Sequence, residues 1–355
     1  MIEILEEAIV YEDKNYYPAF PSIIKLENDH YLVSFRLAPK ESKKISHLNS
    51  LSKIMIVSIY KNKIKYIQEI AEDDDAAKQD VNFFRIDEKT IMLYYFRYTF
   101  HPQSAKKHLK EYTYLEYDSN LIALLSGVGI CMSYNNGETF ESPYFVRIDN
   151  DIKHFAVRGN MCKIENEILM PIYALKEKNK YQSYIISSKN YKKWKIKSFL
   201  AETENIKKDK FEFVEPSLIS HNNNIASFIR THKNNEEAYT SVAYSTNKGR
   251  TFSNPIRTNI LGYPINTLIL ESEKVLITYG YRKKPYGVRG IILNSIEEVF
   301  DIEKINNSKE IIIENKMKSP DCGYPWCIED NGKIICIYYG HLDSTRAIYM
   351  KKFRI

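Results

Sequence analysis

The chain has little glycine or proline for its length, 12 of each among 355 residues. This scarcity excludes collagen-like and low-complexity proteins and predicts a packed globular body. Charge of one sign is not concentrated either, because the formal net charge of +6 is spread along the sequence. Nucleic-acid-binding proteins normally cluster their basic residues, so we expect no nucleic-acid partner. A mildly basic surface suits an anionic substrate.

Cysteine is also scarce, with five residues and no C-x-x-C pair. This odd number indicates neither a disulfide framework nor a zinc ribbon, and we interpret the cysteines as buried thiols in a reducing compartment. No metal-ligand set with a recognisable spacing is present in the sequence, so we expect no metal and no cofactor.

Long apolar runs and targeting signals are missing from the sequence. The N-terminus, MIEILEEAIVYEDK, is acidic where a signal peptide carries positive charge before an apolar core. The longest apolar stretch, 121–132, contains Ser126, Gly127 and Gly129 and is shorter than the roughly 20 residues of a spanning helix. We therefore expect a cytoplasmic protein without a membrane span and leave its oligomeric state open.

Sustained helical periodicity is scarce, and only the segment 104–116 is interpreted as a short helix. Short runs rich in Tyr, Ile, Val and Phe recur instead, among them IMIVSIY, TIMLYYF and KIICIYYG. Most of them follow turn residues, as in Asp330-Asn331-Gly332. Such runs are typical of strands after tight turns, so the chain is predicted to be mainly β.

One hairpin unit recurs six times along the chain. It begins with a strand that carries proline or glycine, passes a polar turn and ends in an apolar strand. The first strands lie near Pro21, Asn82, Gly159, Pro216, Pro264 and Pro325. This spacing fits a four-stranded blade plus loops, so the sequence predicts an all-β, six-bladed β-propeller formed as a single domain by residues 1–355.

A second repeated element lies between these hairpins. Residues 133–140 and 245–252 share the frame S-x-N-x-G-x-T-F, with weaker copies near Ser188 and Asn294. In such a frame Ser and Asn bond local backbone groups, Gly takes a positive φ and the aromatic residue packs inward. We interpret these segments as rigid hairpins that brace the fold and do not contact a substrate.

This pattern resembles the sialidase (neuraminidase) superfamily, whose six-bladed propellers carry BNR or Asp-box hairpins of the form S-x-D-x-G-x-T-W/F. Both clear copies here have Asn at the Asp position. The resemblance extends over residues 17–349. It implies that the N-terminal segment Ile2–Val10 closes the ring by joining the last blade, which leaves few unpaired strand edges.

The resemblance also implies an active site on the propeller axis, where a tyrosine activated by a glutamate is the nucleophile. Tyr324 matches the nucleophile and Glu215 matches the glutamate. Arg230 and Arg289 match arginines that bind the substrate carboxylate. A buried glutamate is costly unless it is paired, and these groups from three blades satisfy one another around an axis. The alternatives are a structural Glu215–Arg230 ion pair and a core role for Tyr324.

The chain departs from the family pattern at two places. The family's Arg-Ile-Pro motif, with the first carboxylate-binding arginine, is Ala19-Phe20-Pro21 here. The family's general acid is an Asp in a following loop, but residues 40–49 contain none. Glu41 and His47 are the candidate acids, because either side chain acts as a general acid when its pKa is near neutrality.

Four further charged residues stand where predicted inner strands begin or end, so each is a candidate substrate-binding residue. The alternative for each is a surface position or an ordinary salt bridge. They are Arg36, Asp80, Arg158 and Arg282.

The leading interpretation is a sialidase-like exo-glycoside hydrolase that removes a terminal acidic sugar, namely sialic acid, a related keto-deoxy sugar acid or a uronic acid. Arginines suit the carboxylate of such a sugar because they bind it with two hydrogen bonds. One alternative is a polysaccharide lyase acting on uronates, with His47, His154 or His232 at the axis. Another is a glycan-binding propeller that has lost its acid.

Overall fold

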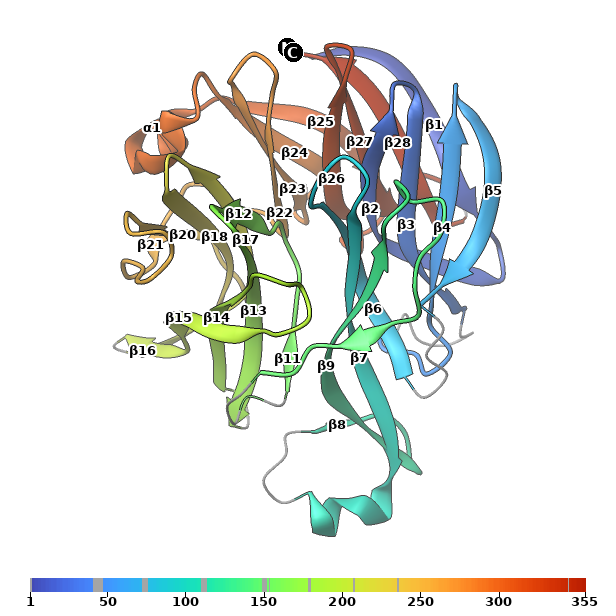
Figure 1. Cartoon of the computed structure of the whole chain (residues 1–355), viewed down its shortest axis with the longest axis vertical. Helices are drawn as coiled ribbons and strands as arrows, with labels where there is room; N and C mark the ends of the chain where they lie inside the picture. Colours follow the sequence, from blue (N-terminus) through green and yellow to red (C-terminus); the bar gives the residue numbers. More distant parts are fainter. Residues whose placement is uncertain are drawn as a thin grey trace.

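The computed structural model describes residues 2–40, 47–71, 76–109, 114–148, 152, 154–177, 180–206, 208–234, 236–343 and 345–355. These residues form six antiparallel sheets arranged around a centre as the blades of a propeller (Figure 1). The all-β, six-bladed prediction is therefore confirmed.

The first three blades follow one another along the chain. Blade 1 contains β2 (Tyr16–Glu27), β3 (His30–Pro39), β4 (Lys53–Tyr60) and β5 (Lys63–Ile70). Blade 2 contains β6 (Ala76–Arg85), β7 (Ile91–Pro102), β9 (Leu121–Ser133) and β10 (Tyr144–Phe145), with β8 (Tyr114–Glu116) paired to β9. Blade 3 contains β11 (Phe155–Ala156), β13 (Glu167–Glu177), β14 (Lys180–Ser188) and β15 (Lys195–Glu202), with β12 (Cys162–Ile164) paired to β13.

The remaining blades complete the ring. Blade 4 contains β16 (Glu204–Ile206), β17 (Asp209–His221), β18 (Asn224–Lys233), β20 (Ser241–Ser245) and β21 (Ile256–Arg257), with β19 (Glu236–Glu237) paired to β18. Blade 5 contains β22 (Ile265–Ile269), β23 (Val275–Tyr281), β24 (Tyr286–Leu293) and β25 (Glu310–Met317). Blade 6 contains β26 (Gly323–Asp330), β27 (Lys333–Gly340), β28 (Ala347–Arg354) and, from the other end of the chain, β1 (Glu3–Glu12).

Pairing of β1 with β28 closes the ring, as the sequence predicts. The two strands are antiparallel, with Glu3 opposite Arg354 and Glu12 opposite Ala347. The two ends of the chain consequently lie together in Figure 1. Because the chain continues from β1 in blade 6 into β2 in blade 1, the hydrogen bonds between β1 and β28 hold the first and last blades together.

The hydrophobic core lies between neighbouring blades. One cluster joins Val33 and Val57 of blade 1 to Ile335 and Ile337 of blade 6, and all four side chains are buried. Each such aliphatic side chain contributes roughly 1.5–3 kcal/mol when it is removed from water. The β-branched runs of the sequence thus explain both the strands and the packing of one blade on the next.

The two S-x-N-x-G-x-T-F segments form matching turns. Ser133 Oγ accepts from the N–H of Gly137 at 2.9 Å, and Asn135 Oδ1 accepts from the N–H of Thr139 at 3.0 Å. The same two bonds recur in the second segment with the same lengths, between Ser245 and Gly249 and between Asn247 and Thr251. In both segments the Asn Nδ2 also donates to the Thr hydroxyl at 2.8 Å, a bond that an Asp carboxylate cannot donate.

The helix predicted over 104–116 is wrong in most of its length. The structure has a six-residue 3₁₀-helix, η1 (Gln103–His108), and then the short strand β8. Two further helical segments, η2 (Glu297–Phe300) and α1 (Ile302–Asn307), follow β24. Helix η1 and β8 lie on an arm that projects from blade 2 at the bottom of Figure 1. Because β8 pairs with β9, sheet hydrogen bonds override the local helical pattern.

Candidate active site on the propeller axis

The innermost strands of four blades contain the same β-bulge, in which two residues of this strand lie opposite one residue of the next. The first bulge residue is left-handed in each case, with φ of 55° at Phe20, 44° at Asp80, 49° at Glu215 and 51° at Tyr324. Proline follows in three of the four, where no ladder N–H is needed. A bulge re-aims its side chain, and left-handed backbone at non-glycine residues is typical of functional sites.

Two of these bulge residues meet across the propeller axis. Tyr324 Oη lies 3.5 Å from Glu215 Oε1, and Arg230 Nη1 donates to the same oxygen at 2.6 Å. Tyr324 and Glu215 are buried, and the Arg230 side chain is 14% exposed. The structure therefore brings together three of the predicted site residues from blades 4 and 6.

The surroundings of Tyr324 keep its hydroxyl protonated. Burial, followed by the charges of Glu215 and Asp80, raises the pKa of Tyr324 well above its ordinary value, while Arg230 and Arg282 act in the opposite direction. A protonated phenol is the donor in its contact with Glu215. The carboxylate is thus placed to accept the phenol proton when Tyr324 acts as a nucleophile.

Arginines from blades 3, 4 and 5 surround this pair. The guanidinium carbons of Arg158 and Arg282 lie 4.8 Å and 5.6 Å from the ring centroid of Tyr324. Those of Arg230 and Arg282 lie 3.9 Å and 5.1 Å from the ring centroid of Tyr263. Cations over aromatic faces are attracted by the ring quadrupole, which holds these arginines near the axis.

Asp80 supplies a second buried carboxyl group at the axis. Burial raises its pKa to about 7, the charge of Arg158 acts against this shift and the charge of Glu215 adds to it. Asp80 is therefore partly protonated near neutral pH, whereas an exposed aspartate is ionised at that pH.

Arg289 and Arg36 were also predicted to lie at the site, and each has its own surroundings. Arg289 Nη1 donates to Glu310 Oε1 at 2.5 Å, and its guanidinium lies 3.4 Å from the Tyr281 ring centroid. Arg36 is completely buried, and its guanidinium nitrogens have no hydrogen-bond partner among the described residues. Burial lowers the pKa of Arg36 to about 10. Arg36 lies directly opposite Ala19 in the β2–β3 hairpin, so both side chains project from the same face.

Only one of the two candidate acids, His47, lies among the described residues. Glu41 lies outside the described residues. His47 Nε2 is 3.0 Å from Asp321 Oδ1, and the His47 ring packs edge-on against Phe20 with centroids 5.1 Å apart. Sequence reasoning missed Asp321, although its place three residues before Tyr324 is a signal that it lies near the site.

His154 and His232, the other two histidines predicted for the axis, are respectively hydrogen-bonded to the backbone and uncharged at neutral pH. His154 Nδ1 is hydrogen-bonded to the backbone oxygen of Leu125 at 2.6 Å. Burial, and then the charge of Arg230, lowers the pKa of His232 to about 4. His232 is therefore uncharged at neutral pH.

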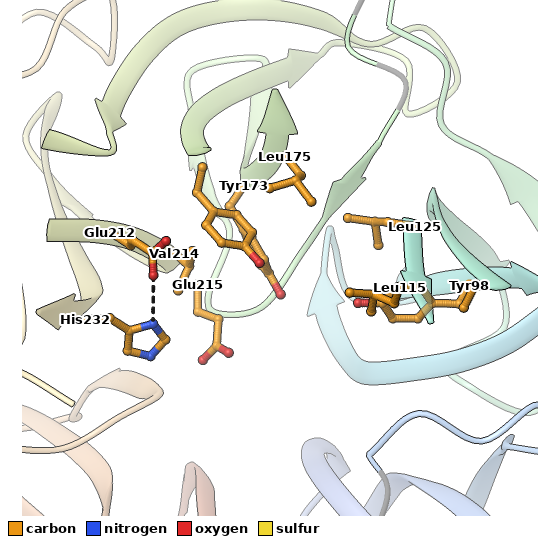
Figure 2. A pocket seen from close by; sticks show the side chains of 11 residues that line it. Tyr98, Leu115, Leu125, Tyr173, Leu175, Glu212, Val214, Glu215 and His232 are labelled. Atoms are coloured by element: carbon orange, nitrogen blue, oxygen red, sulfur yellow. Dashed lines mark ion pairs between the residues drawn. The ribbon is translucent and has the colours of Figure 1, made fainter. Parts of the chain in front are cut away.

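A cavity of about 280 Å³ opens beside Glu215 between blades 2, 3 and 4. Figure 2 shows Glu212, His232 and Glu215 on one side of it and Tyr98 and Leu115, from the blade 2 arm, on the other. Its remaining walls are Ala123, Leu125, Tyr173, Leu175, Tyr181 and Val214. The sequence did not indicate which of its 28 tyrosines face this cavity.

The described residues contain neither a metal-binding cluster of side chains nor a helix that could span a membrane. No group of three or more His, Cys, Asp or Glu side chains among them is arranged to hold a metal ion. None of the described helices combines the length and the apolar character that crossing a bilayer requires.

Comparisons with known proteins place this geometry in context. No family model matches the chain, and no curated protein matches it either. A solved structure from Dyadobacter fermentans, a protein of unknown function, matches with a TM-score of 0.86 at 23% identity, covering 100% of this chain and 99% of that one.

Solved sialidases match more distantly. A Hadza microbial sialidase has a TM-score of 0.68 at 10% identity, covering 96% of this chain and 66% of that one. Trypanosoma rangeli sialidase in complex with sialic acid has a TM-score of 0.60 at 10% identity, covering 97% of this chain and 56% of that one. This chain therefore spans less than two thirds of the length of these sialidases. At such identities the likeness concerns the fold, and the chain has the six-bladed β-propeller fold of the sialidases.

Proposed function

We propose that the protein is an exo-glycoside hydrolase that removes a terminal acidic sugar, either sialic acid or a related keto-deoxy sugar acid. The observation that carries the proposal is the convergence of Tyr324 Oη and Arg230 Nη1 on Glu215 Oε1, at 3.5 Å and 2.6 Å. The sialidase fold supports it. One matching structure is Trypanosoma rangeli sialidase with 2,3-difluorosialic acid as a covalent intermediate.

In the proposed reaction Glu215 accepts the phenol proton as Tyr324 Oη attacks the anomeric carbon of the sugar. A covalent glycosyl-tyrosine forms, and water then hydrolyses it, so two displacements retain the configuration of the anomeric carbon. Glu215 must be a carboxylate to accept this proton, and Arg230 donates a hydrogen bond to it.

We assign recognition of the sugar carboxylate to Arg230 and Arg282. Both guanidinium groups contact the ring of Tyr263, and Arg282 also lies over Tyr324. Guanidinium groups bind carboxylates with two parallel hydrogen bonds. Arg289 also matches the family pattern, and it donates a hydrogen bond to Glu310 as Arg230 does to Glu215. The tyrosine-rich cavity beside Glu215 has room for substituents of the sugar ring.

The test is hydrolysis of a panel of aryl glycosides of sialic acid, related keto-deoxy sugar acids and glucuronic acid. Tyr324→Phe and Glu215→Gln should each lower kcat/KM by about 10²–10⁴-fold or more, because each removes a group that moves a proton in the reaction. Tyr338→Phe is the matched control. Tyr338 is also buried and also hydrogen-bonded to a glutamate, Glu314, at 3.2 Å.

Three outcomes separate the alternatives. Release of one acidic sugar that both site variants abolish and Tyr338→Phe retains supports the proposal. Binding of these sugars without turnover would replace it with a glycan-binding propeller. An unsaturated, ultraviolet-absorbing product from a uronate glycan would replace it with a lyase.

A further inference from the structure

The proposed hydrolysis leaves one proton unassigned, and the inference below rests on that proposed function. When the glycosidic bond breaks, the departing oxygen of a sugar or alkyl alcohol needs a proton, which a positioned side chain supplies. Residues 40–49 contain no Asp, so the residue type that the family uses for this step is missing there.

His47 is linked to the nucleophile Tyr324 through one aromatic ring, that of Phe20. Its ring packs against Phe20, with centroids 5.1 Å apart, and the Phe20 ring lies 4.6 Å from the Tyr324 ring. The His47 side chain is 45% exposed. It is therefore open to a ligand.

A carboxylate orients the His47 ring. His47 Nε2 contacts Asp321 Oδ1 at 3.0 Å, and Nδ1 is the second ring nitrogen that can carry a proton. A carboxylate on one ring nitrogen sets the orientation of the ring. Such a pair has the donor and the orienting group of a general acid in one unit.

Groups from four segments hold Asp321 ionised. The hydroxyls of Tyr17 and Tyr339 donate to it at 2.6 Å and 2.7 Å, and Arg346 Nη1 lies 2.6 Å from Oδ2. Burial raises the pKa of Asp321, but the hydrogen bond and charge of His47, with Arg346 and Tyr17, outweigh it and lower the pKa far below its ordinary value. Buried Arg36 adds a further positive charge nearby.

We propose that His47, oriented by Asp321, is the general acid and base of the reaction. As the bond from Tyr324 Oη to the anomeric carbon forms, the bond from that carbon to the leaving oxygen breaks. The imidazolium proton passes to the leaving oxygen, and the phenol proton passes to Glu215. In the second step neutral His47 takes a proton from water, whose oxygen bonds to the anomeric carbon. The bond to Tyr324 breaks, and Glu215 returns its proton to the phenol.

Two other titratable groups fit this role less well. Asp80 exchanges its proton near neutral pH, but it is only 4% exposed and its strongest charge interaction is with Arg158. His232 is uncharged at neutral pH because its pKa is lowered to about 4 by burial first and by Arg230 second. Neither group therefore combines a proton to donate with access to a leaving group.

The decisive experiment compares two leaving groups on one acidic sugar: 4-nitrophenol, which departs without a proton, and methanol, which needs one. His47→Gln should lower kcat/KM for the methyl glycoside by about 10²–10⁴-fold and that for the nitrophenyl glycoside by less than about tenfold. Asp321→Asn should show the same selectivity with a smaller loss. The loss of rate at high pH that reports deprotonation of the acid should disappear in His47→Gln.

His221→Gln is the matched control, because His221 is likewise a partly exposed histidine beside a carboxylate, with Nε2 3.2 Å from Glu297 Oε1. It should leave both rates unchanged. Equal losses of His47→Gln on the two glycosides, or no loss on either, would overturn the assignment of His47. Absence of turnover by the unmodified protein on every acidic glycoside would instead overturn the proposed function, and the acid with it. Since the His47 side chain is 45% exposed, its substitution should not prevent folding.

Discussion

Blades 1 and 4 have the same backbone at the axis but different side chains on it. In blade 4 the bulge presents Glu215, and Arg230 on the next strand lies opposite the residue before it. In blade 1 the bulge presents Phe20, and Arg36 lies at the corresponding cross-strand position. Both blades therefore carry an arginine at this cross-strand position, but only blade 4 carries a carboxylate at the bulge.

This difference separates the role of the fold from the role of the side chain. Glu215 gives Arg230 a hydrogen-bonded partner and keeps it at the site. Phe20 offers Arg36 only an aromatic face, 6.0 Å from the guanidinium carbon, and Arg36 stays buried. Phe20 instead packs on Tyr324 and His47. The bulge positions a residue at the axis, and the chemistry of that residue decides what the blade contributes.

The largest effect should be on kcat, when the bulge residues Glu215 of blade 4 and Phe20 of blade 1 are each substituted. Glu215→Gln should lower kcat by about 10²–10⁴-fold because the amide cannot accept the Tyr324 proton. Phe20→Leu keeps an apolar side chain and should lower kcat by less than about tenfold. Steady-state kinetics on the same acidic glycoside measures both. A larger loss for Phe20→Leu than for Glu215→Gln would reverse the roles given to the two blades.

The two arginines should respond oppositely in stability, and Arg230 should show the larger change. Arg230→Met leaves Glu215 as a buried carboxylate without its cation, which should cost about 3–5 kcal/mol in the free energy of unfolding. Denaturant unfolding of the variant measures this cost. A change smaller than about 1 kcal/mol would mean that Glu215 is stabilised by groups other than Arg230.

Arg36→Met should have the opposite sign. It replaces a buried guanidinium that has no hydrogen-bonded partner in the described part of the chain by an apolar chain of similar length, so the free energy of unfolding should rise by about 1 kcal/mol or more. The same denaturant experiment checks the result. A marked loss of stability would show that Arg36 interacts favourably with the nearby charges of Asp80 and Asp321.

Asp80, the bulge carboxyl of blade 2, should change how the stability of the protein depends on pH. Asp80 has a pKa of about 7 in the folded protein because burial disfavours its charged form, and an unfolded aspartate titrates near 3.8. Between these values the folded state holds a proton that the unfolded chain releases, so this contribution to stability is present at low pH and is lost as pH rises from about 4 to 7. Asp80→Asn should therefore flatten the fall in stability over that range. Unfolding measured at several pH values tests it, and an unchanged pH dependence would contradict the raised pKa.

Much of the fold was predictable from the sequence because it follows from local patterns. The six hairpin units correspond to the first strands of six blades, and Ile2–Val10 lies in the segment that closes the ring. The structure of segment 104–116 was not predictable, because the pairing of β8 with β9 is a tertiary contact that outweighs the local helix preference. The proposed roles of Tyr324, Glu215 and Arg230 remain predictions, and their proximity gives those predictions a geometry.

The surroundings of the other site residues were beyond the sequence. Arg282 and Arg289 are close in sequence, but the pairing of β24 with β25 brings Arg289 to Glu310, whereas Arg282, just beyond the end of β23, lies over Tyr324. His47 and Asp321 come from opposite ends of the chain and meet only because blades 1 and 6 are neighbours. No local pattern contains such pairings.

By itself the sequence determined the strands, their sixfold repetition, the turns that brace them and the identities of the chemical groups. These depend on side-chain alternation, turn residues and repeat length, all of which act over a few residues or a fixed period. The tertiary structure decided which groups share the axis, which of them are desolvated and which are paired. Those properties depend on distances between blades and on the exclusion of water, and both arise only when the ring closes.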